Sequence, residues 1–206
     1  MRPTAHSQLE VIYRQLGRSS GFRGFTPAFV IAVAGAAAGA TGLVAILAPG
    51  RSLWFAAVLW TFVGTAIALV VGIAVLVPAA RSASGIRREA AQATAIQMAF
   101  PLVVGFAATA AILVRHPEAI GYLPAIWLAL FGLGVAALAG LIRERVEYAA
   151  IFYLASAAAA YALRPDGAFT FNLAVGAPFT VGHLLTAWIL KTRDEESAGG
   201  TVEDDV

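Results

Sequence analysis

The residue with the clearest capacity for chemistry in this sequence is a histidine in an otherwise apolar stretch near the C-terminus. His183 lies in "TVGHLLTAWIL", and Thr186 follows three residues later on the same helical face. A neutral imidazole donates through one ring nitrogen and accepts through the other, and a polar side chain in hydrocarbon is costly unless it is paired. We therefore expect His183 either to bind a ligand or to form a hydrogen bond between helices.

Thr94 and Gln97, again three residues apart, are the polar residues that we expect to face His183. Both lie in the apolar stretch 93–114, near the end that we expect to face the cytoplasm, at a depth similar to that of His183 in the stretch 171–190. Pro101 follows Gln97 by four residues, and because proline has no N–H it leaves the Gln97 carbonyl without its helical partner. We expect these groups, with Thr186, to line a cavity that faces the cytoplasm, and a structural hydrogen bond between the two helices is the alternative.

Two further polar pairs mark helix faces that we expect to point inward. Thr61 and Thr65 are spaced i, i+4, and Tyr153 and Ser156 are spaced i, i+3. In alanine-rich helices such threonine and serine hydroxyls usually donate to a carbonyl of their own helix, so we assign them no ligand.

The sequence offers little for catalysis. It contains no cysteine, which excludes a thiol nucleophile and a thiolate metal site. Ser156 and His183 invite comparison with rhomboid proteases, but "LASAAAA" lacks the glycine that borders the serine in those enzymes. A haem site needs a second axial histidine, which would have to be the His183 of a second copy. We expect no catalytic residue, no metal and no cofactor, and keep an intramembrane hydrolase as a remote alternative.

Six apolar stretches must position these residues. Of the 206 residues, 60% are hydrophobic and only 13% are charged, about half the charged share of a soluble domain. A helix needs roughly 20 apolar residues to cross a bilayer. Six stretches of this kind, without charges away from their ends, cover 27–48, 53–77, 93–114, 120–142, 147–163 and 171–190. The predicted fold is an all-α, polytopic membrane protein with its transmembrane domain over 26–191.

The basic residues predict the orientation of this domain. Eleven of the fourteen lie in the N-terminal segment, the second and fourth loops and the C-terminal tail, whereas Arg51, Arg115 and Arg164 lie singly in the other three loops. Because short cytoplasmic loops are enriched in lysine and arginine, we expect three hairpins with both termini in the cytoplasm. The abundance of arginine, alanine and glycine is typical of GC-rich bacteria, so the expected location is the bacterial cytoplasmic (inner) membrane.

Polar segments flank the domain on both sides. Within 1–25, Ser7 and Glu10 form a capping box ahead of an apolar helical face made of Leu9, Ile12, Tyr13 and Leu16. We expect a short amphipathic helix on the inner membrane surface, either packed under the bundle or bound by a cytosolic protein partner. Residues 192–206 hold six of the twelve acidic residues and are expected to be disordered.

Small residues recur at four-residue spacing in two of the stretches. Gly35 and Gly39 form a GxxxG pair in the first, and Gly132, Ala136 and Gly140 repeat in the fourth. This spacing permits close approach of helices, either within one chain or between copies. We expect a homo-oligomer.

Three segments resemble a family of small, uncharacterised bacterial integral membrane proteins with six helices: "RSSGFRGFTPAFVIAVAGAAAGATGL", "LPAIWLALFGLGVAALAG" and "VGAPFTVGHLLTAWIL". The similarity runs from Arg18 to Lys191, and Gly182, His183 and Leu184 match a Gly-His-Leu pattern in the last helix of that family. No reaction or ligand comes with this resemblance. Members are described beside winged-helix regulators, which implies a sensor or scaffold.

Taken together, these features predict a non-catalytic membrane protein that binds a small ligand or a cytosolic partner at a cytoplasm-facing polar pocket. An oligomeric passive channel or facilitator is the alternative. Ion-driven transport is disfavoured, because no acidic or basic residue lies in the middle of a stretch. The expected surroundings are a lipid bilayer, and a net charge of +2 gives no reason to expect nucleic acid.

Overall fold

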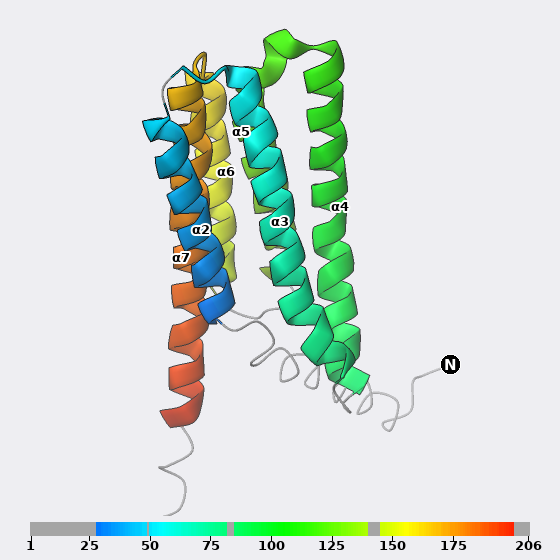
Figure 1. Ribbon diagram of the computed structural model, residues 1–206. Helices are drawn as coiled ribbons and strands as arrows, with labels where there is room; N and C mark the ends of the chain where they lie inside the picture. Colours follow the sequence, from blue (N-terminus) through cyan, green and yellow to red (C-terminus); the bar gives the residue numbers. More distant parts are fainter. Residues whose placement is uncertain (1–27, 49, 82–84, 140–144, 200–206) are drawn as a thin grey trace, which may run out of the picture.

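A computed structural model describes residues 28–48, 50–81, 85–139 and 145–199 (Figure 1). The regular elements in this part of the chain are all helical. Their bounds are α2 Ala28–Leu47, α3 Leu53–Ala80, α4 Gly85–Arg115, the 3-10 helix η1 Pro117–Tyr122, α5 Leu123–Ala139, α6 Val146–Leu163 and α7 Ala168–Gly199. The predicted all-α fold is confirmed for the described residues.

The described residues include six helical spans that are long and apolar enough to cross a membrane. They correspond one to one with the six predicted stretches, and η1 and α5 together form the fourth. Large apolar side chains such as Phe62, Phe100 and Leu163 are exposed on the outside of the bundle. A surface of this kind suits hydrocarbon and is rarely presented to water.

The helices run side by side and alternate in direction (Figure 1). α2 packs most extensively against α7 and α5 against α6, while α3 and α4 form a hairpin that meets the rest mainly through α5 and α2. The links from α2 to α3, from α4 to α5 and from α6 to α7 lie at the upper end of Figure 1. α2 begins and α7 ends at the opposite, lower end.

Glycines hold α2 close to α7. A Cβ added at Gly35 would lie 2.8 Å from the Cβ of His183, and one at Gly39 would lie 3.0 Å from the Thr180 hydroxyl oxygen. The GxxxG pair of the first span therefore serves packing within one chain and seats the part of α7 that carries His183. It gives no support to contact between copies, and the homo-oligomer stays a prediction.

Helices continue past the predicted spans at the lower end. α3 extends to Ala80, α4 begins at Gly85, and α7 continues to Gly199. The structure thus differs from the disorder expected over 192–206, because residues 192–199 are helical. Arginine, glutamate and alanine are good helix formers, so the helix that leaves the apolar span continues until a glycine ends it.

Two predictions fall on residues outside the described part of the chain. One is the amphipathic helix within 1–25, whose proposed apolar face comprises Leu9, Ile12, Tyr13 and Leu16. The other is the disorder of residues 200–206. Both stay predictions.

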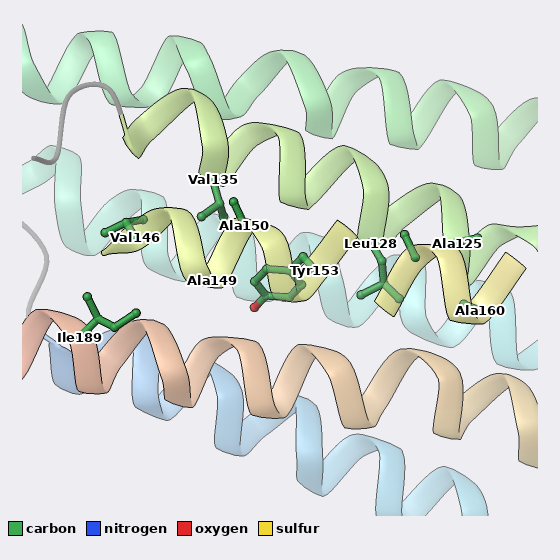
Figure 2. Packing of buried hydrophobic residues seen from close by; sticks show 10 residues of the cluster. Ala125, Leu128, Val135, Val146, Ala149, Ala150, Tyr153, Ala160 and Ile189 are labelled. Carbon is green, nitrogen blue, oxygen red and sulfur yellow. The ribbon is translucent and has the colours of Figure 1, made fainter. Parts of the chain in front are cut away.

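Two clusters of buried side chains hold the bundle together. One lies between α5, α6 and α7 and is centred on Tyr153 and Leu128 (Figure 2). The other lies towards the upper end and includes Trp60, Leu123 and Phe171. The candidate site lies next to these clusters, and its wall includes residues of both.

Candidate functional site

His183 on α7 is held by a hydroxyl group and a backbone carbonyl. Its Nδ1 lies 2.8 Å from the carbonyl oxygen of Phe179, one turn earlier, and 2.9 Å from Oη of Tyr153 on α6. A carbonyl oxygen only accepts, so Nδ1 carries the proton and donates it to Phe179. Nε2 is consequently the unprotonated nitrogen of this imidazole and acts as an acceptor.

A glycine next to the histidine makes room for its tyrosine partner. A Cβ at Gly182 would overlap the Tyr153 ring, so only a residue without a side chain fits where α7 faces this ring. Tyr153 is 0% exposed. Figure 2 shows its ring between α6 and α7, with the hydroxyl oxygen directed towards α7. Gly182 and His183 thus act together, one admitting the ring and the other bonding its hydroxyl.

Aromatic rings fix the plane of the imidazole. Phe131 on α5 stacks on His183 with ring centroids 5.3 Å apart and an interplanar angle of 26°. Tyr153 meets the imidazole edge-on at 88°, and Phe179 lies 5.9 Å away. Such offset and edge-to-face contacts restrict ring rotation, so Nε2 is held in one direction.

A cavity of about 640 Å³ lies inside the bundle next to this cluster. All six spanning helices contribute to its wall, which is mainly apolar. The polar side chains in the wall are few and are mostly hydroxyl groups. They are His183, Tyr153, Thr186, Thr94, Thr61, Thr65 and Thr109, with the indoles of Trp60 and Trp127.

Several threonine hydroxyls of the wall donate to their own helices, Thr109 among them to the Gly105 carbonyl. Thr61 bonds the Ala57 carbonyl at 2.8 Å, Thr65 bonds the Thr61 carbonyl at 2.7 Å, and Thr186 bonds the Gly182 carbonyl at 2.7 Å. The expectation for Thr61 and Thr65 is confirmed. These bonds satisfy the hydroxyl protons but leave oxygen lone pairs at the cavity wall.

Side-chain hydrogen bonds join the helices near the upper end of the cavity. The indole N–H of Trp60 donates to Oδ1 of Asn172 at 2.9 Å, and that of Trp127 donates to the Thr109 hydroxyl at 2.8 Å. Asn172 is only 2% exposed, and Phe171 beside it is fully buried. The polar groups of the outer half are therefore used in tight interhelical bonds.

The cavity is open on the flank of α3 and α4. Several residues of its wall are exposed, among them Leu69 on α3 at 61% and Phe106 on α4 at 60%. No acidic or basic side chain lines the cavity wall among the described residues. In a bilayer this flank would face the lipid chains, and an apolar molecule could pass from them into the cavity.

The structure brings together three of the four predicted site residues. His183, Thr186 and Thr94 line the cavity, whereas Gln97 is not among its lining residues. Oε1 of Gln97 is buried and accepts no hydrogen bond from the described residues. The partner of His183 is Tyr153 and not Gln97, because α6 packs beside α7 at this height.

Sequence reasoning did not identify Tyr153 as the partner of His183, although it placed Tyr153 on an inward face. A signal was present: Tyr153 enters the fifth span from the same side as His183 enters the sixth, and to a comparable depth. The adjacent Gly182 was a second signal, since a glycine beside a buried polar residue often admits a neighbouring ring. The Trp60–Asn172 bond had no sequence signal, because the two residues are 112 positions apart.

Comparison with protein-family models, with curated proteins and with solved structures finds no match to this chain. Within the described residues, no group of three or more histidine, cysteine, aspartate or glutamate side chains could hold a metal ion. What the site does must therefore be inferred from its geometry.

Proposed function

We propose that this chain is a multi-pass protein of the bacterial inner membrane that binds a small apolar ligand without catalysing a reaction. The observation that carries this proposal is the cavity of about 640 Å³, whose mainly apolar wall includes His183 and a few hydroxyl groups. Ligand sites usually measure roughly 300–1,000 Å³ and combine an apolar wall with a few fixed polar groups. The cavity fits both features.

The distribution of arginine supports an orientation with both termini in the cytoplasm. In that orientation the lower end of Figure 1 is cytoplasmic. His183 would lie in the cytoplasmic half of the bilayer, and the end with the Trp60–Asn172 hydrogen bond would lie on the outer side. The resemblance to small bacterial six-helix membrane proteins agrees with this arrangement but adds no ligand.

The geometry favours binding over a passive channel. A channel needs a continuous wettable path, and the outer polar groups Trp60 and Asn172 are buried and bonded to each other. The arrangement also disfavours a hydrolase, because the hydrogen bonds of His183 are to Tyr153 and Phe179 and not to Ser156. Of these three functions, the geometry supports ligand binding best.

A role as a sensor or scaffold follows from the position of α7. This helix carries His183 in its apolar part and continues to Gly199 at the lower end. A ligand that displaces His183 would move the same helix where it emerges, and a cytosolic protein could bind that surface. Binding would thus be passed on through a packed helix.

Filling the cavity should abolish ligand binding without unfolding the protein. Gly64 and Gly72 on α3 line the cavity, and a Cβ at either position meets no atom within 4 Å. Para-hexylphenol, an apolar molecule with one hydroxyl group, serves as the probe ligand. We expect Gly64→Leu and Gly72→Leu to fold normally and to weaken binding of this probe by about tenfold or more. Native mass spectrometry of the full chain measures the affinity. Ala66→Leu, on the same helix but outside the cavity, is the matched control. Undiminished binding in both glycine variants would refute the cavity as the ligand site.

A further inference from the structure

We propose that the cavity selects apolar molecules that carry a hydroxyl group, such as an alkylphenol or a long-chain alcohol. This selectivity presupposes the ligand cavity proposed above and names its ligand class. The selectivity depends on which polar groups of the wall can still donate or accept a hydrogen bond.

The donor groups of the upper wall are already used. The indole N–H groups of Trp60 and Trp127 donate to Asn172 and Thr109. The Thr109 hydroxyl in turn donates to the Gly105 carbonyl at 2.7 Å. A ligand that only accepts hydrogen bonds finds no donor in this part of the wall.

Three further threonine hydroxyls of the cavity wall donate their protons in the same way. Thr61, Thr65 and Thr186 each give their single proton to the carbonyl four residues earlier. A hydroxyl has one proton and two lone pairs, so these side chains offer the ligand lone pairs only. The wall therefore presents acceptors along most of its polar surface.

His183 adds the strongest acceptor. Because Nδ1 donates to the Phe179 carbonyl at 2.8 Å, Nε2 keeps a lone pair, and the described residues offer it no hydrogen bond. The Tyr153 oxygen lies 2.9 Å from Nδ1 and accepts from the same N–H, and because the Tyr153 side chain is fully buried, Nε2 is the group of this pair that remains for a ligand. A ligand hydroxyl can donate to Nε2, whereas an ether leaves Nε2 unpaired.

Two probes of nearly equal shape test the selectivity. Para-hexylphenol carries a hydroxyl, and para-hexylanisole carries a methyl ether that only accepts. We expect the full-length protein to bind the phenol about tenfold more tightly, since the ether leaves a buried acceptor without a partner. Native mass spectrometry of the protein titrated with each probe measures both affinities.

Matched variants assign the selectivity to the imidazole. His183→Phe keeps an aromatic ring against Phe131 but removes both nitrogens, and we expect the two probes to bind it with similar affinity. Tyr153→Phe keeps Nε2 and should keep the preference for the phenol. If His183→Phe does not fold, nitrogen-15 NMR of the wild-type histidines gives a second readout, in which Nε2 should be unprotonated and should shift on addition of the phenol.

The possible outcomes separate the two proposals. Equal binding of both probes by the wild type overturns the selectivity and leaves the ligand cavity standing. Binding of neither probe overturns the cavity as a ligand site. A preference for the phenol that persists in His183→Phe, or a protonated Nε2 in the NMR spectrum, overturns the role given to His183.

Discussion

Replacing Gly182 with alanine should lower the free energy of unfolding by about 3 kcal/mol and should break the hydrogen bond between Tyr153 and His183. The new methyl group would overlap the Tyr153 ring, which is completely buried and has no free volume into which to move. Either α7 moves away from α6 or the ring leaves its rotamer, and both responses separate Oη from Nδ1. Equilibrium unfolding in mixed micelles, with increasing fractions of a denaturing detergent, measures the change.

The same substitution at Gly72 is the control for this prediction. Gly72 also lies within a spanning helix, but a Cβ there meets no atom within 4 Å. Gly72→Ala should be neutral or should stabilise the protein by up to about 1 kcal/mol, because alanine is the better helix former. Equal effects of the two substitutions would show that Gly182 is not needed to seat the Tyr153 ring.

Replacing Tyr153 with alanine should have an effect at least as large, because this ring joins three helices. It packs edge-on against Phe131 at 4.8 Å and lies against Phe179 and His183. Deleting a buried aromatic side chain typically costs about 3–5 kcal/mol, and we expect Tyr153→Ala to fall in that range. In lipid this cost comes from lost packing between helices more than from exposure to water.

Tyr153→Phe separates the ring from its hydroxyl. The variant keeps the aromatic contacts and loses one hydrogen bond, so the expected loss is about 1 kcal/mol. Micellar unfolding again provides the measurement, and the nitrogen-15 signals of His183 report the lost bond. Equal losses for the alanine and phenylalanine variants would contradict the packing role of the ring.

The spanning helices were predictable from the sequence because length and absence of charge suffice to define them. The stretch 147–163, for example, is bounded by Glu147 and Arg164 and becomes α6, Val146–Leu163. Helix ends were less predictable where the chain leaves the apolar region. Residues 192–199 are polar yet helical, because helix propensity and the preceding span decide their conformation, and hydropathy does not.

The candidate site was predictable only in part. The isolated position of His183 identified it as the residue to follow, and the structure places it in the cavity wall. Its partner was not predictable from depth alone, because Gln97 and Tyr153 both qualify by depth, and only the adjacency of α6 to α7 decides between them. Two residues at one depth meet only if their helices are neighbours and both side chains lie on the helix faces that pack together.

The cavity itself could not be predicted. Apolar residues that line it and apolar residues that face outward have the same chemistry, so periodicity does not separate them. Gly64 lines the cavity and Phe62, two positions earlier, is exposed on the outside. This distinction depends on how the α3–α4 hairpin packs against the other helices.

A density map of the full-length protein in lipid nanodiscs tests the central claim most directly. The account predicts six helices within the lipid belt, a cavity next to His183 that contains density for a bound molecule, and a closed outer end where Trp60 meets Asn172. A continuous open passage past Asn172, or an imidazole directed outward to the lipid with no cavity beside it, would contradict the account.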